Sequence, residues 1–286
     1  MNRAVRLMLF SSIMHSFLGV FVKLGAVEIP LMEQIFFRNI PLLLYGYVRL
    51  RKSKASLLPK KSNAFLIFIR AVVGFSSMVG LFYANAKLDL SVAQVLYRTS
   101  PMWIGLLAVF LLKESYDRNK FIALLLAFIG TLLILRPQGY LGIVPGIIGL
   151  YSALAVSVAY ISIHLLQDRE SPDLILFWFA LSCVVLSAAF LPGSFVLPST
   201  KQWIYLFLVA LTGGLGQWSV TIAYQLAPAG EIGIYDYFGV LLSPLLGRFI
   251  FSENISLMKI LGIGFILLAA WFHHGKKFLA KNKDKR

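Results

Sequence analysis

The sequence predicts an all-α integral membrane protein of ten transmembrane helices, arranged as two inverted repeats of five helices each. Three observations predict this fold class: the composition, ten apolar stretches of membrane-spanning length, and self-similarity at a fixed offset. Of the 286 residues, 59% are hydrophobic and 14% are charged, whereas soluble domains carry about 45–50% apolar and about 25% charged residues. This composition argues strongly against a soluble enzyme and a disordered domain. The single cysteine, Cys183, argues against a disulfide-built secreted domain.

The ten apolar stretches are each close to the roughly 20 residues that a helix needs to cross a bilayer. They do not alternate apolar with polar residues and are too long for strands. The first stretch follows Arg3 and Arg6 and exceeds the length of a signal-peptide core, so we expect an uncleaved helix. The expected spans are residues 5–24, 33–49, 64–86, 91–112, 119–136, 143–166, 173–191, 203–226, 231–251 and 257–274.

The basic residues are divided unevenly between the two sides of this arrangement. If the N-terminus is cytoplasmic, 18 of the 27 Lys and Arg lie on the cytoplasmic side, five lie on the other side, and four lie within spans. Cytoplasmic loops carry an excess of Lys and Arg, so this bias predicts that both termini are cytoplasmic. With the short loops, it favours a bacterial inner membrane. The net charge of +15 then orients the helices and meets anionic lipid, and it gives no support to nucleic-acid binding.

The chain also aligns with itself. Residues 84–135 fall without a gap on residues 223–274, at an offset of 139, and Glu28 falls on Glu170 at an offset of 142. Because each half holds an odd number of spans, the second half enters the membrane the opposite way round. Inverted repeats of this kind are typical of transporters and place a binding site near the midplane. The expected division is a first repeat over 1–140, a second over 141–275 and a basic cytoplasmic tail over 276–286.

A series of short motifs runs through both halves. In chain order they are Phe36-Phe37-Arg38, Arg70-Ala71-Val72-Val73-Gly74, Phe82-Tyr83-Ala84-Asn85-Ala86, Thr99-Ser100-Pro101, Lys113-Glu114, Ala223-Tyr224-Gln225-Leu226-Ala227, Tyr235-Asp236-Tyr237 and Ser252-Glu253. Through them the chain resembles the drug/metabolite transporter superfamily, and within it the EamA-type transporters. The resemblance implies ten helices in two EamA repeats and secondary transport of small polar or amphiphilic metabolites. Pro244 lies three to four residues later than Pro101 predicts, so the resemblance implies no shared kink geometry.

Arg98 and Asp236 are the most informative charges inside the spans. An ionisable group at the centre of a membrane helix costs about 2.5–3.5 kcal/mol on insertion scales, so it tends to face a cavity or a partner. The repeat places these two residues at nearly equivalent positions of the fourth and ninth spans, at different depths. Together they suit a zwitterion, with the guanidinium on a carboxylate and the carboxylate on an ammonium. The alternative is a structural ion pair that holds the bundle together.

Polar and aromatic residues extend this candidate site along helix faces. Gln94 lies four residues before Arg98, and Gln217 lies four residues before Thr221, which puts each pair on one face. The alternative for such residues is hydrogen bonding between helices. The expected substrate-binding residues are Arg98, Asp236, Gln94, Tyr97, Tyr235, Tyr237, His15, Gln217 and Thr221, and the candidates for proton coupling are Asp236 and His15.

Arg38 and Arg70 are weaker candidates for substrate contact. Each lies one to two turns from a span end, where a long side chain can reach the interface. Glu33 or Gln34 is placed to neutralise or bond Arg38 at helical spacing.

Two glutamates lie in short loops after the fourth and ninth spans. We expect Glu114 and Glu253 to anchor loops or helix ends. A nucleotide-binding loop of the form G-x-x-x-x-G-K-[ST] and the motifs H-E-x-x-H and G-x-S-x-G do not occur in the sequence. We therefore expect no cofactor and no metal.

The function favoured by the sequence is that of a secondary transporter and not of an enzyme. It would move a small polar or zwitterionic metabolite, such as an amino acid or a nucleoside-like cofactor, by alternating access, driven by protons or an exchanged counter-solute. The expected partners are this small-molecule substrate and membrane lipid, with the chain as a monomer or homodimer. The alternatives are a lipid-linked carrier or flippase that binds a phosphate head group, and an integral-membrane enzyme. Arginines at a lateral opening would favour the flippase, whereas an enclosed cavity would count against it.

Overall fold

The computed structural model describes residues 2–111 and 142–283, together with residues 122, 125, 126, 129, 130, 132 and 133 between them. Every regular element within these ranges is a helix. Most of the expected span over 119–136, and Glu114 with it, lies outside the described residues.

The helices of the first half begin and end close to the expected spans, except that the fourth span is interrupted. They are α1 (Arg3–Gly25), α2 (Leu31–Lys52), a 3-10 turn η1 (Lys61–Asn63), α3 (Ala64–Lys87), α4 (Leu90–Tyr97) and α5 (Ser100–Leu111).

The second half repeats this pattern, with an interruption in the ninth span. Its elements are α7 (Ile143–Leu165), α8 (Pro172–Ala188), α9 (Thr200–Leu226), α10 (Ala229–Ile232), a 3-10 turn η4 (Gly233–Tyr237), α11 (Phe238–Phe251) and α12 (Leu257–Lys283). Within the described residues, four helical segments are both long and apolar enough to cross a membrane: Arg3–Gly25, Lys61–Lys87, Ile143–Leu165 and Thr200–Leu226.

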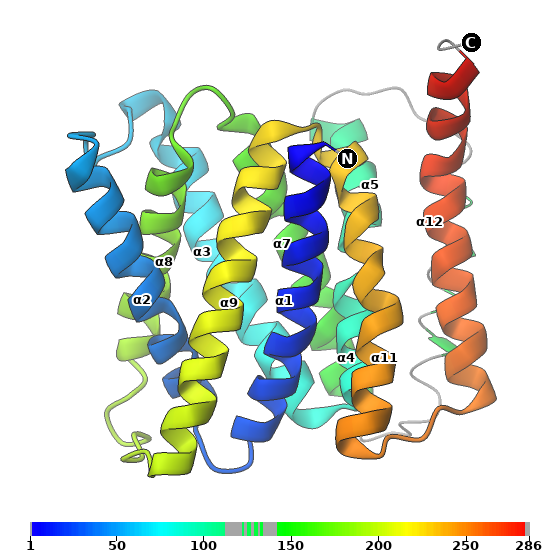
Figure 1. Ribbon diagram of the computed structural model, residues 1–286, viewed down its shortest axis with the longest axis horizontal. Helices are drawn as coiled ribbons and strands as arrows, with labels where there is room; N and C mark the ends of the chain where they lie inside the picture. Colours follow the sequence, from blue (N-terminus) through cyan, green and yellow to red (C-terminus); the bar gives the residue numbers. More distant parts are fainter. Residues whose placement is uncertain are drawn as a thin grey trace.

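The helices stand side by side as an upright bundle, with α1 beginning and α12 ending at the same edge, the upper edge in Figure 1. Helix α1 packs most extensively on α9, α3 on α7, and α2 on α8. Elements of the two halves of the chain therefore alternate across the bundle, and its centre lies between them.

The bundle buries polar groups and exposes apolar ones. Ser12, Ser16 and Ser157 are fully buried, while Phe207 and Phe249 are largely exposed on α9 and α11. This distribution suits a chain surrounded by lipid, because the solvent outside the bundle is as apolar as the side chains that face it.

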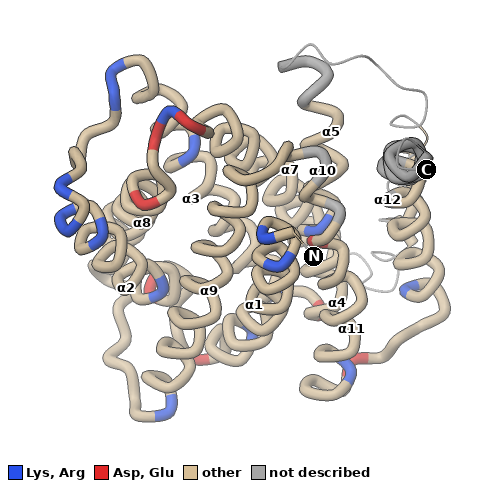
Figure 2. The backbone as a smooth tube through the Cα atoms, turned by 45° about the horizontal axis from the view of Figure 1, so that its top comes forward, with Lys and Arg blue, Asp and Glu red and all other residues tan. Residues whose placement is uncertain are grey.

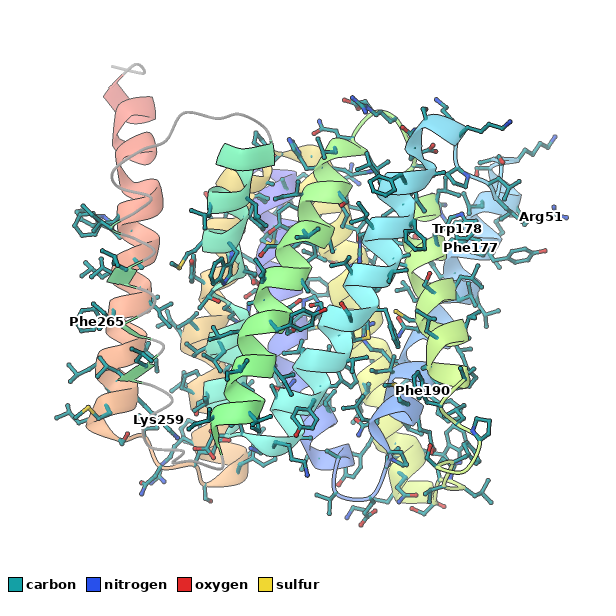
Figure 3. The ribbon with its side chains drawn as sticks, turned by 180° about the vertical axis from the view of Figure 1, so that it is seen from behind. Arg51, Phe177, Trp178, Phe190, Lys259 and Phe265 are labelled. Atoms are coloured by element: carbon teal, nitrogen blue, oxygen red, sulfur yellow. The ribbon has the colours of Figure 1, made fainter. Side chains whose placement is uncertain are left out.

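Charged side chains lie mainly at the two ends of the bundle. Figure 2 shows Lys and Arg gathered around the N-terminus and the end of α2. Arg51 projects outward at the upper edge, whereas Lys259 lies at the opposite edge, at the start of α12 (Figure 3). Lys259 is buried there and forms an ion pair with Asp89.

The fourth and ninth spans are each broken, so the prediction of continuous helices over 91–112 and 231–251 is wrong. The first break lies at Arg98 and Thr99, between α4 and α5. Pro101 lacks an N–H to donate to the carbonyl of Tyr97, which ends the helical ladder there. The second break is the 3-10 turn η4, and α11 continues through Pro244. Under the offset of 139, the first break falls on residues 237 and 238, where η4 meets α11. The two breaks therefore adjoin under the repeat, although the two prolines do not correspond.

Glu253 holds the start of α4 in place from the loop after α11. Its carboxylate accepts hydrogen bonds from the backbone N–H groups of Leu90 and Ser91 and from the Ser91 hydroxyl, the last at 2.7 Å. Lys23, at the end of α1, lies 3.3 Å from the same carboxylate. A carboxylate on the first N–H groups of a helix satisfies donors that have no partner within it. Glu253 thus has the capping role that its loop position predicts.

Candidate functional site

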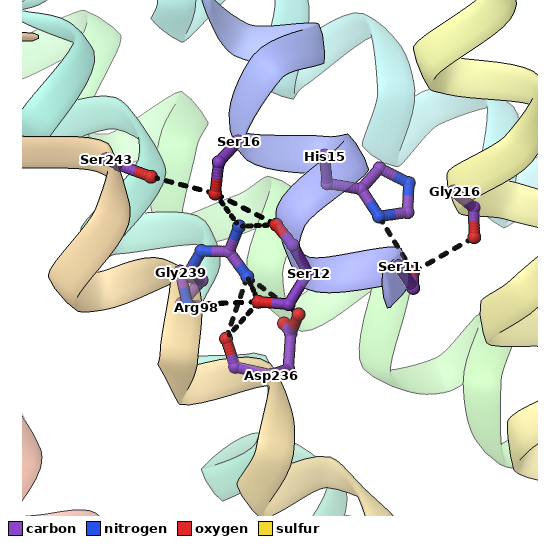
Figure 4. Close-up of polar contacts among 9 residues, drawn as sticks. All are labelled: Ser11, Ser12, His15, Ser16, Arg98, Gly216, Asp236, Gly239 and Ser243. Atoms are coloured by element: carbon purple, nitrogen blue, oxygen red, sulfur yellow. Dashed lines mark hydrogen bonds and ion pairs between the residues drawn. The ribbon is translucent and has the colours of Figure 1, made fainter. Parts of the chain in front are cut away.

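Arg98 and Asp236 meet in a network that we call the Arg98 clamp, formed by Ser12, Ser16, Arg98, Asp236 and Gly239 (Figure 4). One terminal nitrogen of Arg98, Nη1, donates to Asp236 Oδ1 at 2.7 Å, to the Asp236 carbonyl at 2.8 Å and to Ser12 Oγ at 2.9 Å. The other, Nη2, donates to the Ser12 carbonyl at 3.1 Å and to Ser16 Oγ at 2.9 Å. The Gly239 N–H also donates to Ser12 Oγ, at 3.0 Å.

The clamp joins both broken spans to α1. Arg98 caps the C-terminal end of α4, Asp236 lies in η4, and Gly239 is the second residue of α11. The two charges therefore do not lie at different depths, as the continuous-helix prediction implied, because each break brings its residue to the same level. Arg98 is 1% exposed, and its terminal nitrogens are already occupied by protein acceptors. This geometry is that of the structural ion pair which the sequence left as the alternative.

A small cavity lies beside the clamp, among α1, α2, α3, α4, α7, α8 and α9. Its volume is about 30 Å³, which holds a water molecule or two but not a whole metabolite. Its polar and aromatic lining includes His15, Arg38, Arg70, Tyr97, Tyr160 and Gln217, with Phe82 and Phe179 among the apolar residues. We call this space the central cavity.

Arg38 reaches the central cavity from α2 and is held by its neighbours. Its Nη1 donates to Asn39 Oδ1 at 3.0 Å, and its Nη2 donates to the Gly213 carbonyl at 3.1 Å. The expected neutralisation by Glu33 or Gln34 is wrong. Glu33 instead accepts the Val196 N–H at 3.1 Å, and Gln34 donates to the Ile29 carbonyl. Both side chains, at the start of α2, therefore form hydrogen bonds with the backbone of neighbouring loops.

Arg70 enters the same cavity from α3 and is the least constrained of the buried arginines. Its guanidinium lies over the ring of Phe179, with Cζ 4.0 Å from the ring centroid, and it folds back across Gly74, one turn later on α3. Its Nε, like those of Arg38 and Arg98, is buried without a hydrogen-bond partner among the described residues, but unlike those two arginines it makes no hydrogen bond to these residues through its terminal nitrogens either. Arg38 and Arg70 are each 2% exposed, so neither reaches the interface, and the expectation that they snorkel is wrong.

The residues predicted for the site fall into three groups. His15, Tyr97 and Gln217 line the central cavity, and Arg98 and Asp236 form the clamp. The remaining four lie elsewhere. Gln94 donates to Asn85, Thr221 accepts from Gln217, Tyr235 packs against the core near α10, and Tyr237 is buried with a hydroxyl that has no partner among the described residues.

His15 connects the cavity to α9. Its Nδ1 lies 3.1 Å from the Ser11 hydroxyl, which in turn donates to the Gly216 carbonyl at 2.9 Å. The imidazole sits so close to Gly216 that a Cβ there would lie 3.0 Å from the ring. This histidine is therefore both hydrogen-bonded to its neighbours and exposed to the cavity.

Larger openings also adjoin the bundle. Phe82 belongs to the wall of the central cavity and also to that of a vestibule of about 360 Å³, which lies at the lower edge between the end of α1 and the start of α2. A separate groove of about 430 Å³ runs between α2 and α9 and is lined by apolar residues such as Pro41, Phe207 and Trp218. The cavity arginines do not line this lateral groove.

Arg38 and Arg70 line the cavity although their sequence positions made them the weaker candidates, and Phe179 lines it without any signal in the sequence. For the two arginines a usable signal was present, because Gly74 and Gly213 differ by 139 positions and so correspond under the repeat offset. Each of these glycines lies beneath an arginine in the structure. The pairing of Arg38 with Gly213 joins α2 to α9, however, and no local pattern predicts it.

The family model described as the EamA-like transporter family matches residues 2–136 and again residues 144–273. The chain belongs to the EamA-like transporter family. With the apolar helices described above, membership identifies a multi-pass membrane protein of the drug/metabolite transporter superfamily.

Similar proteins are named as transporters. A Helicobacter pylori protein named as an uncharacterized transporter is 29% identical over 92% of this chain and 91% of its own length. A pseudopaline exporter of Pseudomonas aeruginosa is 27% identical over 94% of this chain and 95% of its own. An S-adenosylmethionine uptake transporter of Rickettsia felis is 24% identical over 96% and 92%. A solved crystal structure shares the fold, with a TM-score of 0.71 over 98% of both chains at 16% identity.

Proposed function

We propose that this EamA-family chain is a secondary transporter that moves a small polar or zwitterionic metabolite by alternating access. The observation that carries the proposal is the pair of broken spans, joined by the Arg98 clamp beside a small cavity with arginines in its lining. Broken helices at corresponding positions of two halves are typical of secondary transporters, in which the halves move around a site near the midplane. The cavity is too small for a metabolite in this conformation, so loading requires such a movement.

The contacts between helices support two inverted repeats of five spans within this proposal. The packing of α1 on α9 has its counterpart in that of α7 on α3, and the contact of α1 with α11 has its counterpart in that of α7 with α5. Side chains follow the same relation. Glu28 accepts a hydrogen bond from Gln202 at 3.1 Å, and Glu170 accepts one from Asn63 at 2.8 Å. Glu28 corresponds to Glu170 at the offset of 142, and Asn63 corresponds to Gln202 at the offset of 139.

Asp236 is the proposed coupling residue, with His15 as the second candidate. The Asp236 side chain is 14% exposed, and its second carboxylate oxygen makes no hydrogen bond within the described part of the chain. Protonation of Asp236 would remove the charge that faces Arg98 and so weaken the joint between the two broken spans. A proton could thereby release the movement that exposes the cavity.

The proposed setting is a bacterial inner membrane with both termini in the cytoplasm, because the basic residues gather at the edge where α1 begins. The lipid-linked carrier is the less favoured function, since Arg38 and Arg70 are buried and the lateral groove is apolar. The relatives include one exporter and one uptake transporter by name, so direction and substrate both have to be measured.

The test is uptake and efflux in proteoliposomes with a panel of labelled amino acids, carboxylates and nucleoside-like metabolites, with and without a pH gradient. We expect at least one class to be moved faster than in empty liposomes and to exchange against itself. If no member moves in either direction, although the protein is folded and inserted, the proposal fails.

The coupling role is tested with Asp236→Asn, which keeps the shape of the side chain. We expect Asp236→Asn to retain exchange of substrate between the two sides but to lose acceleration by a pH gradient. His15→Gln, measured in parallel, decides between the two candidates. An Asp236→Asn protein that responds to the gradient as the unsubstituted chain does would remove Asp236 from the coupling step.

A further inference from the structure

We infer that Arg70, assisted by Arg38, binds a carboxylate of the substrate, and that the central cavity selects small solutes of net negative charge. The inference rests on the proposed transport function and names the substrate class for it. It departs from the zwitterion site expected at Arg98 and Asp236, because the clamp occupies those two groups with each other.

The charge of the cavity is the first observation. Two guanidinium groups line the space, and among the described residues that line it none is Asp or Glu. In the described part of the chain, neither Arg38 nor Arg70 forms an ion pair with a carboxylate. Arginine does not lose its proton in proteins, and a buried charge without a partner is strongly destabilising. An anion in the cavity supplies the missing charge.

The difference between the two arginines is the second observation. Both terminal nitrogens of Arg38 already donate, to Asn39 and to Gly213. Arg70 has one face covered by Phe179 and makes no hydrogen bond to any described residue. A stacked guanidinium keeps its five N–H donors in the plane of the group, where they match the two oxygens of a carboxylate. Arg70 is therefore the primary anchor, and Arg38 adds charge from a fixed position.

The remaining polar lining fits an anion better than a cation. Tyr97, Tyr160 and Gln217 line the cavity, and each carries an O–H or N–H group that can donate a hydrogen bond. An ammonium group in the same space would face two guanidiniums and, among the described residues that line it, no carboxylate. The order of binding should accordingly run from dicarboxylates through monocarboxylates to neutral amides, with diamines weakest.

The experiment measures binding to the purified full chain in detergent, by ligand-induced thermal shift and by isothermal titration at constant ionic strength. The probes are succinate, propionate, succinamide and 1,4-diaminobutane, which share a small size and differ in charge. We expect succinate to bind most tightly and the amide and the diamine to give no shift. Equal binding of succinate and succinamide, or tighter binding of the diamine, would overturn the inference.

The variant Arg70→Gln should weaken succinate binding about ten- to a hundredfold, as expected for loss of a charge-assisted contact. Arg70→Lys keeps the charge but not the planar fork and should weaken it less. Arg51→Gln is the matched control, because Arg51 also lies over an aromatic ring, that of Tyr47, but is exposed at the end of α2. Elution and thermal midpoint without ligand establish that each variant is folded. Folded Arg70→Gln that binds succinate normally contradicts the inference.

Binding is measured without transport, so the carboxylate site and the transport function can each be refuted while the other stands. If carboxylates bind through Arg70 but no solute crosses the membrane, the site stands and the transport function falls. If a neutral or cationic solute is transported and Arg70→Gln moves it at the normal rate, transport stands and the carboxylate site falls.

Discussion

Each of the three arginines that are buried among the described residues lies against a glycine. Arg38 covers Gly213, Arg70 covers Gly74, and the Arg98 guanidinium covers Gly239. Glycine lacks a Cβ, so the wide planar group can lie directly on the helix backbone. In the apolar interior this closeness lets a guanidinium reach carbonyl oxygens, as Arg38 does at Gly213. The glycines are therefore part of the polar interior although they carry no polar side chain.

Two adjacent glycines of α9 provide a test at this scale. A Cβ at Gly213 would clash with Arg38, whereas a Cβ at Gly214 would meet no atom within 4 Å. We expect Gly213→Ala to be destabilised by about 1–3 kcal/mol through overpacking, and to bind carboxylate probes more weakly because Arg38 is displaced. Gly214→Ala should be neutral or slightly stabilising, since alanine favours helix. Thermal unfolding in detergent measures both, and an equal effect at the two positions would contradict the packing argument.

At the scale of elements, the breaks in the fourth and ninth spans determine how Arg98 and Asp236 meet. Residues 91–112 and 231–251 are apolar enough for single helices, and the sequence favoured two continuous spans. Pro101 was a visible signal for the first break. The second is a 3-10 turn over Gly233–Tyr237, and its position depends on Arg98 and Ser12, which reach it from other helices.

The cap on α4 gives a prediction for an element. Glu253→Ala removes the acceptor for the Leu90 and Ser91 N–H groups and leaves Lys23 without its carboxylate. Loss of a cap costs about 0.5–2 kcal/mol, so the thermal midpoint should fall by several degrees. Glu253→Gln keeps an amide oxygen and should fall less. Glu28→Ala is the control, because Glu28 is an exposed loop carboxylate with one hydrogen bond to Gln202, and an equal loss there would argue against the capping role.

At the scale of the whole molecule, the distribution of Lys and Arg predicts the orientation. Both ends of the chain should report as cytoplasmic when fused to a fluorescent protein, and fusions after Val27 or Pro198 should report as external with alkaline phosphatase. Val27 and Pro198 lie in connections between helices at the edge opposite the start of α1. A map with the two termini on opposite sides would contradict both the orientation and the even number of spans.

Phe82 stands between the central cavity and the vestibule and should act as a barrier to access from that edge. The buried Cys183 can be replaced by serine, and Ser77→Cys then places one thiol in the cavity wall. We expect Phe82→Ala to speed the reaction of that thiol with a small charged thiol reagent about tenfold or more, as for removal of a barrier of at least 1.4 kcal/mol. Tyr83→Ala is the control, because Tyr83 lines the vestibule but not the cavity. Equal rates in the two variants would exclude Phe82 as the barrier.

The sequence by itself determined the class of the protein and most of its helix ends. The expected spans at 64–86 and 143–166 agree within one residue with α3 and α7. A helix that crosses the bilayer must be mostly apolar over about 20 residues, so the composition and length of an apolar stretch indicate a span. His15, Tyr97 and Gln217 could also be assigned to the site, because polar residues inside apolar spans face inward.

Only the tertiary structure decided which charged side chains are paired with each other and which have no ion-pair partner among the described residues. Arg98 and Asp236 look like an open site in the sequence, yet they close on each other. Arg38 and Arg70 look like residues near the interface, yet they are buried at the central cavity with no described carboxylate partner. The partner of a charge depends on which helices meet at its depth, and those contacts join residues more than a hundred positions apart. No local pattern carries that information, so the ligand chemistry of this transporter follows from the packing of its helices.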